Sequence, residues 1–153
     1  IVQTCGNVTD SDLEFRVVAT NRHRGNTVVS FVSVVDVWLS QHGQQTHITI
    51  GQNRRVKIDG NAVDTPAYHI NDLVEVHEEQ GFVILNAFNE FIVHFDGRSI
   101  LLIRVSERFY GSLCGMCGNF NGNPADDKVM PSGDPAPDDN SFGHSWKSDT
   151  SIP

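Results

Sequence analysis

Short runs of Val, Ile, Phe and Thr recur along this chain and leave it few possible folds. They return about every 10–15 residues and are separated by Gly, Asn and Asp, which is typical of β-strands joined by turns. No stretch keeps apolar residues at the i, i+3, i+4, i+7 spacing of an amphipathic helix, so little helix is expected. The sequence therefore predicts an all-β fold, an antiparallel β-sandwich or meander.

The expected strands can be placed by their alternation of apolar and polar residues. Alternation with a period of two indicates a strand with one buried and one solvated face. The predicted strands are residues 13–20, 28–39, 47–50, 55–58, 73–77, 82–88, 91–95 and 99–105. Two tight turns are expected at residues 59–61 and 96–97, because Gly and Asn tolerate positive φ and Asp favours turns.

Length and charge exclude two classes of protein. The chain has 153 residues, which suits one domain, and its formal net charge of −8 disfavours binding to duplex nucleic acid. The longest apolar run, residues 28–39, contains Ser and Asp and is shorter than the roughly 20 residues of a membrane span. We therefore expect no nucleic-acid partner and no membrane insertion.

The composition changes after Tyr110. Residues 111–139 are rich in Gly, Pro, Asn and Asp and show little apolar periodicity. A loop this long in a compact domain is usually functional or disordered, and its two cysteines favour functional order. We predict a single domain over residues 1–153, with a β core at about 13–110 and a loop and tail at 111–153.

Three cysteines suggest covalent cross-links. Cys114 and Cys117 have CxxC spacing, but the neutral and acidic residues that follow do not favour a reactive thiolate for disulfide exchange. A zinc ribbon would need a second such pair, which the sequence lacks. Structural half-cystines are the preferred interpretation. Together with Cys5 the count is odd, so one cysteine is either free or paired outside the chain.

Oxygen donors alternate through residues 119–127. Asn119 and Asn121 can supply amide oxygens, Asn123 a main-chain carbonyl, and Asp126 and Asp127 carboxylates. Ca²⁺ prefers such a flexible set of six to eight oxygens, whereas Mg²⁺ demands a near-octahedral shell. The spacing is not that of an EF-hand, so a solvated Asn- and Asp-rich turn remains the alternative.

No motif indicates catalysis. The chain lacks a nucleophile elbow, a zinc-protease helix motif and a phosphate-binding glycine loop, so we expect that it is not an enzyme. The sequon at residues 7–9 makes Asn7 a candidate glycosylation site. The sequon and the cysteines together favour a secreted protein.

Residues 110–122, Tyr-Gly-Ser-Leu-Cys-Gly-Met-Cys-Gly-Asn-Phe-Asn-Gly, resemble a motif of the von Willebrand factor type D domain. The resemblance continues through residues 123–127 and 142–147. Residues 15–17, 21–26 and 56–60 look most like the zonadhesin, tectorin and IgGFc-binding-protein branch of that family. The resemblance thus extends from about Cys5 to Lys147.

This resemblance implies a pairing and a partner. If this chain follows the family's pattern, Cys5 should bond Cys114, and residues 119–127 should bind Ca²⁺. The family's opening segment, with Gly-Asp-Pro-His and Phe-Asp-Gly, is absent before Ile1. A second polypeptide, disulfide-linked through Cys117, is therefore expected to supply the missing N-terminal strands. The Ca²⁺ shell of this chain is expected to be one ligand short, because the family also uses an Asp of the Phe-Asp-Gly segment. A truncated domain with a free Cys117 is the alternative.

The resemblance also implies a function. Type D modules suggest a secreted, calcium-binding, disulfide-linked interaction module of an adhesive, mucin-like or extracellular-matrix glycoprotein, with other extracellular glycoproteins or further D modules as partners. Three alternatives remain open. The parent could be a yolk lipoprotein or a luciferase-like enzyme, or the CxxC could exchange disulfides during multimer assembly.

Overall fold

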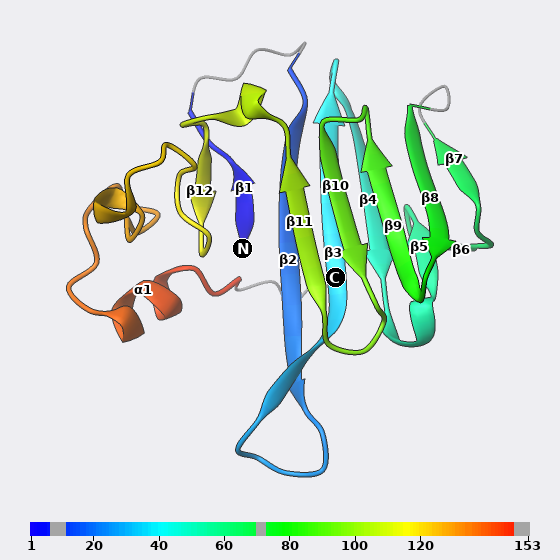
Figure 1. Cartoon of the computed structure of the whole chain (residues 1–153), viewed down its shortest axis with the longest axis horizontal. Coiled ribbons are helices and arrows are strands. Elements are labelled where there is room, and N and C mark those ends of the chain that lie inside the picture. The colour runs from blue at the N-terminus through cyan, green and yellow to red at the C-terminus, as the bar shows by residue number, and fades with distance from the viewer. Residues whose placement is uncertain (7–11, 70–72, 149–153) are drawn as a thin grey trace. The chain divides into compact units, whose positions relative to one another are not determined.

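The chain folds into two antiparallel β-sheets with little helix, which confirms the predicted all-β class (Figure 1). The computed structural model describes residues 1–6, 12–69 and 73–148. Each predicted strand corresponds to a strand of the structure, and the predicted strand at residues 91–95 matches β10 in both bounds.

The strands are divided between the sheets as follows. The first sheet has the order β12 (Leu113–Gly115), β1 (Val2–Thr4), β2 (Glu14–His23), β3 (Ser30–Gln41), β4 (Gln44–Ile50), β5 (Val56–Ile58), β6 (Asn61–Val63). The second has the order β11 (Leu101–Val105), β10 (Phe91–Phe95), β9 (Phe82–Ala87), β8 (Val74–Glu79), β7 (Ala67–His69). The remaining elements are the 3₁₀ turns η1 (Gln52–Arg54), η2 (Glu107–Phe109) and η3 (Pro124–Asp126), and the helix α1 (Asp139–Ser145).

The chain forms two compact units. We call one the disulfide unit, which comprises Ile1–Val18, Leu39–Gln44 and Glu107–Pro153. The other is the sandwich unit, which comprises Ala19–Trp38 and Gln45–Ser106. The single-domain organisation expected from the sequence stays a prediction.

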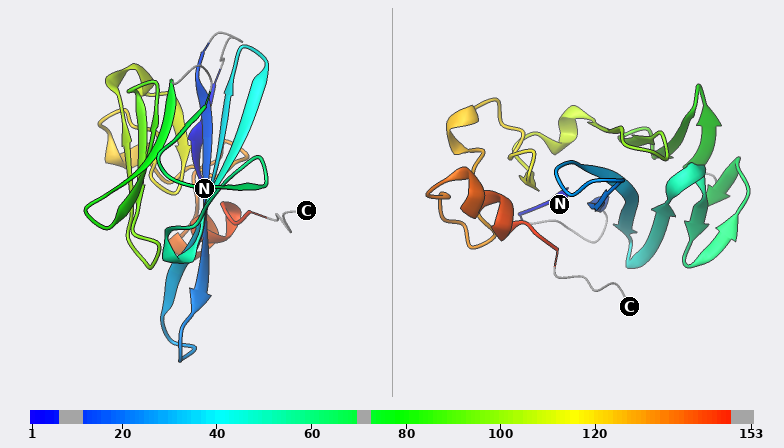
Figure 2. Two further views of the ribbon diagram at one scale, coloured as in Figure 1. Left: turned by 90° about the vertical axis from the view of Figure 1, so that its right-hand side faces the viewer. Right: turned by 90° about the horizontal axis from the view of Figure 1, so that it is seen from below.

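The strands of the sandwich unit form two layers, one from each sheet (Figure 2). The core of the unit follows from strand alternation. Val76 pairs with Leu85, and Leu85 pairs with Val93, so a row of three buried side chains crosses β8, β9 and β10. Ile48 and Ile58 form a buried pair across β4 and β5 in the other sheet. Such two-residue periodicity places every second side chain in the core, so the hydrophobic pattern also fixes the register.

Among the described residues of the sandwich unit, one charged side chain is buried. Asp36 on β3 accepts hydrogen bonds from Thr49 Oγ1 and His47 Nε2, both at 2.8 Å, and the His47 ring stacks on Trp38 at 4.5 Å. A buried carboxylate is costly unless it is hydrogen-bonded, and these two neighbours on β4 supply the partners.

Both predicted turns are present in the sandwich unit. Asp59 and Gly60 have φ of 48° and 82° and connect β5 to β6, as a hairpin turn requires. In the turn between β10 and β11, the Asp96 carboxylate accepts three main-chain N–H groups at 2.8–2.9 Å, which belong to Arg98, Ser99 and Ile100. Partial burial opposes ionisation of Asp96, but these hydrogen bonds prevail and lower its pKa below the ordinary value.

The disulfide unit places β1 between β12 and β2. Phe15 and Phe109 pack edge to face in its core, with ring centroids 5.3 Å apart. Near its C-terminal end, Asp138 caps α1 by accepting the Ser141 N–H at 2.7 Å. Trp146, just after the helix, is buried and donates its indole N–H to the Val129 carbonyl at 2.9 Å. The tail is thereby held against the loop that precedes it.

Candidate functional site

The disulfide unit contains a cross-link between Cys5 and Cys114, the pair that the resemblance implies. The pairing of β1 with β12 brings the two cysteines together, because Thr4 lies opposite Leu113 and the Cys5 N–H donates to the Ser112 carbonyl at 2.8 Å. Their Cα atoms are 5.9 Å apart, in the usual range for a disulfide.

Cys117, the second half of the CxxC motif, is not part of that bond. Its side chain is exposed, and no cysteine among the described residues pairs with it. A turn separates it from Cys114, because the Gly118 N–H donates to the Gly115 carbonyl at 3.1 Å. The turn therefore presents the thiol to solvent at the start of the Asn- and Asp-rich loop.

Side chains of three predicted ligands converge in this loop. Asn119 Nδ2 donates to Asp126 Oδ1 at 3.0 Å, and Asn121 Nδ2 donates to Asp126 Oδ2 at 2.9 Å. Hydrogen bonds from Asn121 and Asn119 lower the pKa of Asp126 below its ordinary value, because they favour the charged carboxylate. The loop thus holds an ionised carboxylate between two amides.

Asp127, another predicted ligand, contacts the main chain of Asn119. Its Oδ1 accepts the Asn119 main-chain N–H at 3.2 Å. This approach requires glycine at position 118, where φ is 82° and an added Cβ would collide with the Asp127 carboxylate. Asn119 therefore contacts both carboxylates of the loop.

Successive Asx turns shape the chain between these residues. Asn119 Oδ1 accepts the Asn121 N–H at 3.1 Å, and Asn121 Oδ1 accepts the Asn123 N–H at 2.8 Å. Asn123 then caps η3 by accepting the Ala125 N–H at 3.2 Å, while its carbonyl accepts the Asp126 N–H at 3.5 Å. Asn side chains suit this role because they mimic a main-chain turn.

The amide, carboxylate and carbonyl oxygens of this loop are the types of ligand that bind a hard cation. The described part of the chain contains no group of three or more His, Cys, Asp or Glu side chains suited to a metal, so a cation here needs amide and main-chain oxygens as well. Asn119 and Asn121 turn their Nδ2 groups toward Asp126. A half-turn of each amide would present its oxygen to a cation in place of the two Asx-turn hydrogen bonds that these oxygens now accept. Ca²⁺ accepts such mixed oxygen shells.

The loop borders a groove of about 370 Å³ in the disulfide unit. The Cys5–Cys114 disulfide, the Asp126 and Asp127 carboxylates and the buried Trp146 contribute to its lining. An acidic end and an apolar wall therefore meet in the same groove.

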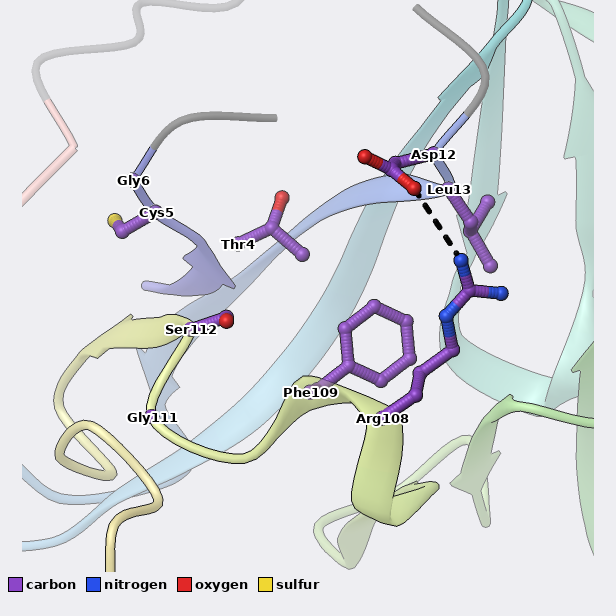
Figure 3. Close-up of a pocket in the computed structure, with 9 residues that line it drawn as sticks. All are labelled: Thr4, Cys5, Gly6, Asp12, Leu13, Arg108, Phe109, Gly111 and Ser112. Atoms are coloured by element: carbon purple, nitrogen blue, oxygen red, sulfur yellow. Dashed lines mark hydrogen bonds and ion pairs between the residues drawn. The ribbon is translucent and has the colours of Figure 1, made fainter. Parts of the chain in front are cut away.

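A second hollow of the disulfide unit, of about 330 Å³, is lined by residues that include Thr4, Leu13 and Phe109 (Figure 3). None of the predicted Ca²⁺ ligands lines it. Its two charged side chains, Arg108 and Asp12, form an ion pair at 3.4 Å and so neutralise one another. Among the described residues that line this hollow, no cluster of side chains is suited to chemistry.

Sequence reasoning did not identify two contacts that support the loop. The Tyr110 hydroxyl donates to the Asn121 carbonyl, and the Tyr110 ring meets Phe120 at 5.9 Å. The only sequence signal was the presence of aromatic residues on either side of the glycines. The predicted glycosylation site, Asn7, lies outside the described residues.

Comparison with known proteins identifies the family. The family model for the von Willebrand factor type D domain matches residues 1–134, which include the disulfide and the whole Asn- and Asp-rich loop. The chain belongs to the von Willebrand factor type D family. This confirms the family that the cysteine and asparagine motif indicated.

Several relatives carry a similar type D segment. The chain is 36% identical over 149 residues to zonadhesin of Homo sapiens, covering 97% of this chain and 5% of the relative. It is 33% identical over 135 residues to the IgGFc-binding protein of Homo sapiens, covering 88% of this chain and 2% of the relative. It is 31% identical over 133 residues to alpha-tectorin of Mus musculus, covering 87% of this chain and 6% of the relative.

This type D chain therefore spans only a small part of the relatives it matches. Among its described residues, no helix has the length and apolar character that a membrane-spanning helix requires.

Proposed function

We propose that this chain is a non-catalytic, calcium-binding interaction module of a secreted, adhesive extracellular glycoprotein. Its similarity to zonadhesin, alpha-tectorin and the IgGFc-binding protein supports the adhesive and extracellular part of the proposal. The calcium part rests on one observation, the convergence of the Asn119 and Asn121 amides on the Asp126 carboxylate.

Calcium would stabilise the fold by neutralising the negative charge of the two carboxylates in this loop. Asp126 and Asp127 are adjacent carboxylates joined through Asn119, and like charges held close together repel. A divalent ion bound between them removes that repulsion and binds only the native loop. Such a ligand raises the free energy of unfolding by mass action.

Thermal unfolding in Ca²⁺ and in chelator tests this part of the proposal. The melting temperature should be higher in Ca²⁺ by several degrees, since about 2.7 kcal/mol is gained at a hundredfold excess over the dissociation constant. Asp126→Asn with Asp127→Asn should remove the difference while keeping side-chain shape.

The matched control is Asp134→Asn with Asp139→Asn, which removes two aspartates of the same unit outside the loop. It should keep the calcium response. Equal melting temperatures of the native chain in Ca²⁺ and in chelator would refute calcium binding.

Cys117 is proposed to carry the disulfide link to a partner polypeptide. Its exposure and its lack of a disulfide partner among the described residues support this, since an exposed thiolate in an oxidising compartment does not persist unmodified. Other extracellular glycoproteins or D modules are further proposed partners.

Mass spectrometry under non-reducing and reducing conditions tests the link on protein from a secretory source. A heavier species should collapse on reduction to the mass of this chain alone. A Cys117→Ser variant should lack the heavier species. A single mass under both conditions, with one titratable thiol, contradicts the link.

A further inference from the structure

Five arginines gather at the end of the sandwich unit where three connections meet. The connections are the β2–β3 hairpin, η1 and the β10–β11 turn. The arginines are Arg22, Arg24, Arg54, Arg55 and Arg98, five of the eight in the chain. We name them the arginine cluster. We propose that the arginine cluster is a binding surface for a sulfated polysaccharide.

The β2–β3 hairpin presents the first two arginines to solvent. All residues from 21 to 31 are exposed, and Val28 at its tip is 88% exposed. Arg24 lies over the Phe31 ring at 5.5 Å, so its guanidinium is held in place although it stays accessible. Arg22 lies near the end of β2 and is exposed, two residues before Arg24.

Direct contacts join the hairpin to the β10–β11 turn. A guanidinium nitrogen of Arg24 donates to the main-chain carbonyl of Arg98. The Arg98 side chain itself is exposed. The main chain of that turn is fixed by the three hydrogen bonds to Asp96, so Arg98 projects from an ordered segment.

The same turn packs closely on η1. The Asn53 N–H donates to the Gly97 carbonyl at 3.2 Å, and a Cβ at position 97 would lie 2.6 Å from Arg54 N. Asn53 and Arg54 both have positive φ, a conformation that non-glycine residues seldom adopt. The fold therefore places Arg54 beside the turn that bears Arg98, and the exposed Arg55 follows Arg54 in the chain.

The positive charge of the cluster is largely uncompensated. Among the described residues, no carboxylate forms an ion pair with Arg22, Arg24, Arg55 or Arg98. Arg54 is the exception, with Glu78 at 3.2 Å. The Asp96 carboxylate of the β10–β11 turn attracts Arg98 electrostatically, but its hydrogen bonds go to the main-chain N–H groups of the turn. In a chain of net charge −8, this end is locally basic.

Arginine determines the ligand chemistry. A guanidinium is planar, permanently charged and weakly hydrated, and it donates paired hydrogen bonds to oxyanions. Sulfate groups spaced along a polysaccharide can engage arginines on several connections at once. Clusters of basic residues are typical of heparin-like and nucleic-acid partners. The choice of a polysaccharide over nucleic acid rests on the proposed extracellular function.

Binding of the whole chain to immobilised heparin at about 0.1 M salt tests the proposal, because exposed charges are not fully screened there. The native chain should bind, and Arg22→Ser with Arg24→Ser should weaken binding at least about tenfold. Arg55→Ser with Arg98→Ser should give a loss of similar size. The two variants alter different connections, so a folding defect in one leaves the other informative.

The matched control is Arg104→Ser with Lys147→Ser, which removes two positive charges outside the cluster. It should bind heparin within about twofold of the native chain. Equal losses in all three variants would mean that only net charge matters, and would overturn the site.

Three further probes identify the ligand class. Desulfated heparin should bind at least about tenfold more weakly than heparin. Equal or tighter binding of desulfated heparin, poly-glutamate or single-stranded DNA would overturn the proposal in favour of another anion. All measurements are made in Ca²⁺ and in chelator, so that failure of calcium binding and failure of heparin binding are distinguished.

Discussion

The sandwich unit and the disulfide unit are stabilised in different ways. In the sandwich unit, alternating strands bury Val, Ile, Leu and Phe between two sheets, and residues such as Leu85 are fully buried. In the disulfide unit the strands β1 and β12 have three residues each, and the chain beyond them is held by a disulfide, Asx turns and one buried tryptophan.

The difference explains how a long polar loop with exposed carboxylates can be held in place. Short strands bury too little apolar surface to hold a long Gly- and Asn-rich segment. Two other kinds of interaction stabilise the segment in place of buried apolar surface. They are the disulfide between Cys5 and Cys114 and the hydrogen bonds to Asp126 and Asp127. The disulfide unit can therefore expose carboxylates that a hydrophobic core would exclude.

The largest effect is expected from a cavity in the sandwich unit. Leu85→Ala removes a fully buried side chain and should lower the free energy of unfolding by about 3–5 kcal/mol. Denaturant unfolding measures it. Leu102→Ala, in the same sheet but 46% exposed, should cost less than about 1 kcal/mol. Similar costs at the two leucines would show that the sandwich is not the main apolar core.

Removal of the disulfide should have the next largest effect and should act on the other unit. Cys5→Ser with Cys114→Ser frees a loop of 109 residues and should cost about 2–4 kcal/mol. Amide hydrogen exchange should accelerate in β1 and β12 and stay slow in β9 and β10. Cys117→Ser, at an exposed position, should leave exchange unchanged. Uniform acceleration across both units would contradict the comparison.

The smallest effect is expected from pH at one turn of the sandwich unit. The Asp96 carboxylate has a lowered pKa in the folded state, so it stabilises the fold above the ordinary Asp pKa of about 3.9. This contribution is lost as pH falls through the folded-state pKa. Asp96→Asn should therefore be less stable than the native chain at pH 7, by about 1 kcal/mol, and the difference should shrink in acid.

The control for this pH dependence is Asp64→Asn, which removes an exposed aspartate of the same unit. It should leave the pH dependence of unfolding close to that of the native chain. A constant difference between the native chain and Asp96→Asn at every pH would contradict the assignment to Asp96.

Sequence alone predicted much of the sandwich unit. The runs at residues 82–88 and 91–95 became β9 and β10, and the expected turn at Asp59–Gly60 follows β5. Such features are local, because a strand of five or six alternating residues carries its own pattern. The strands β1, β6, β7 and β12 were missed, since three residues are too few to show a period and depend on their neighbours for pairing.

The candidate site was partly predictable for the same reason. Asn119 to Asp127 are close in sequence, so their types and spacing indicated a cation before any fold was known. Two features depended on the path of the loop in space. Asn119 contacts both carboxylates, and Gly118 must lack a Cβ because it lies beside Asp127.

The sequence by itself determined the strand pattern, the family and the oxygen-rich loop, because each is written in neighbouring residues. Only the tertiary structure decided that Asp36 would be buried beside His47, and that Arg24, Arg54 and Arg98 would meet at one end of the sandwich. The net charge did not indicate this basic end, because a sum over 153 residues does not say where the charged side chains lie in the fold. Contacts between distant residues arise from sheet register and turn geometry, which fix where side chains meet only after the core has formed.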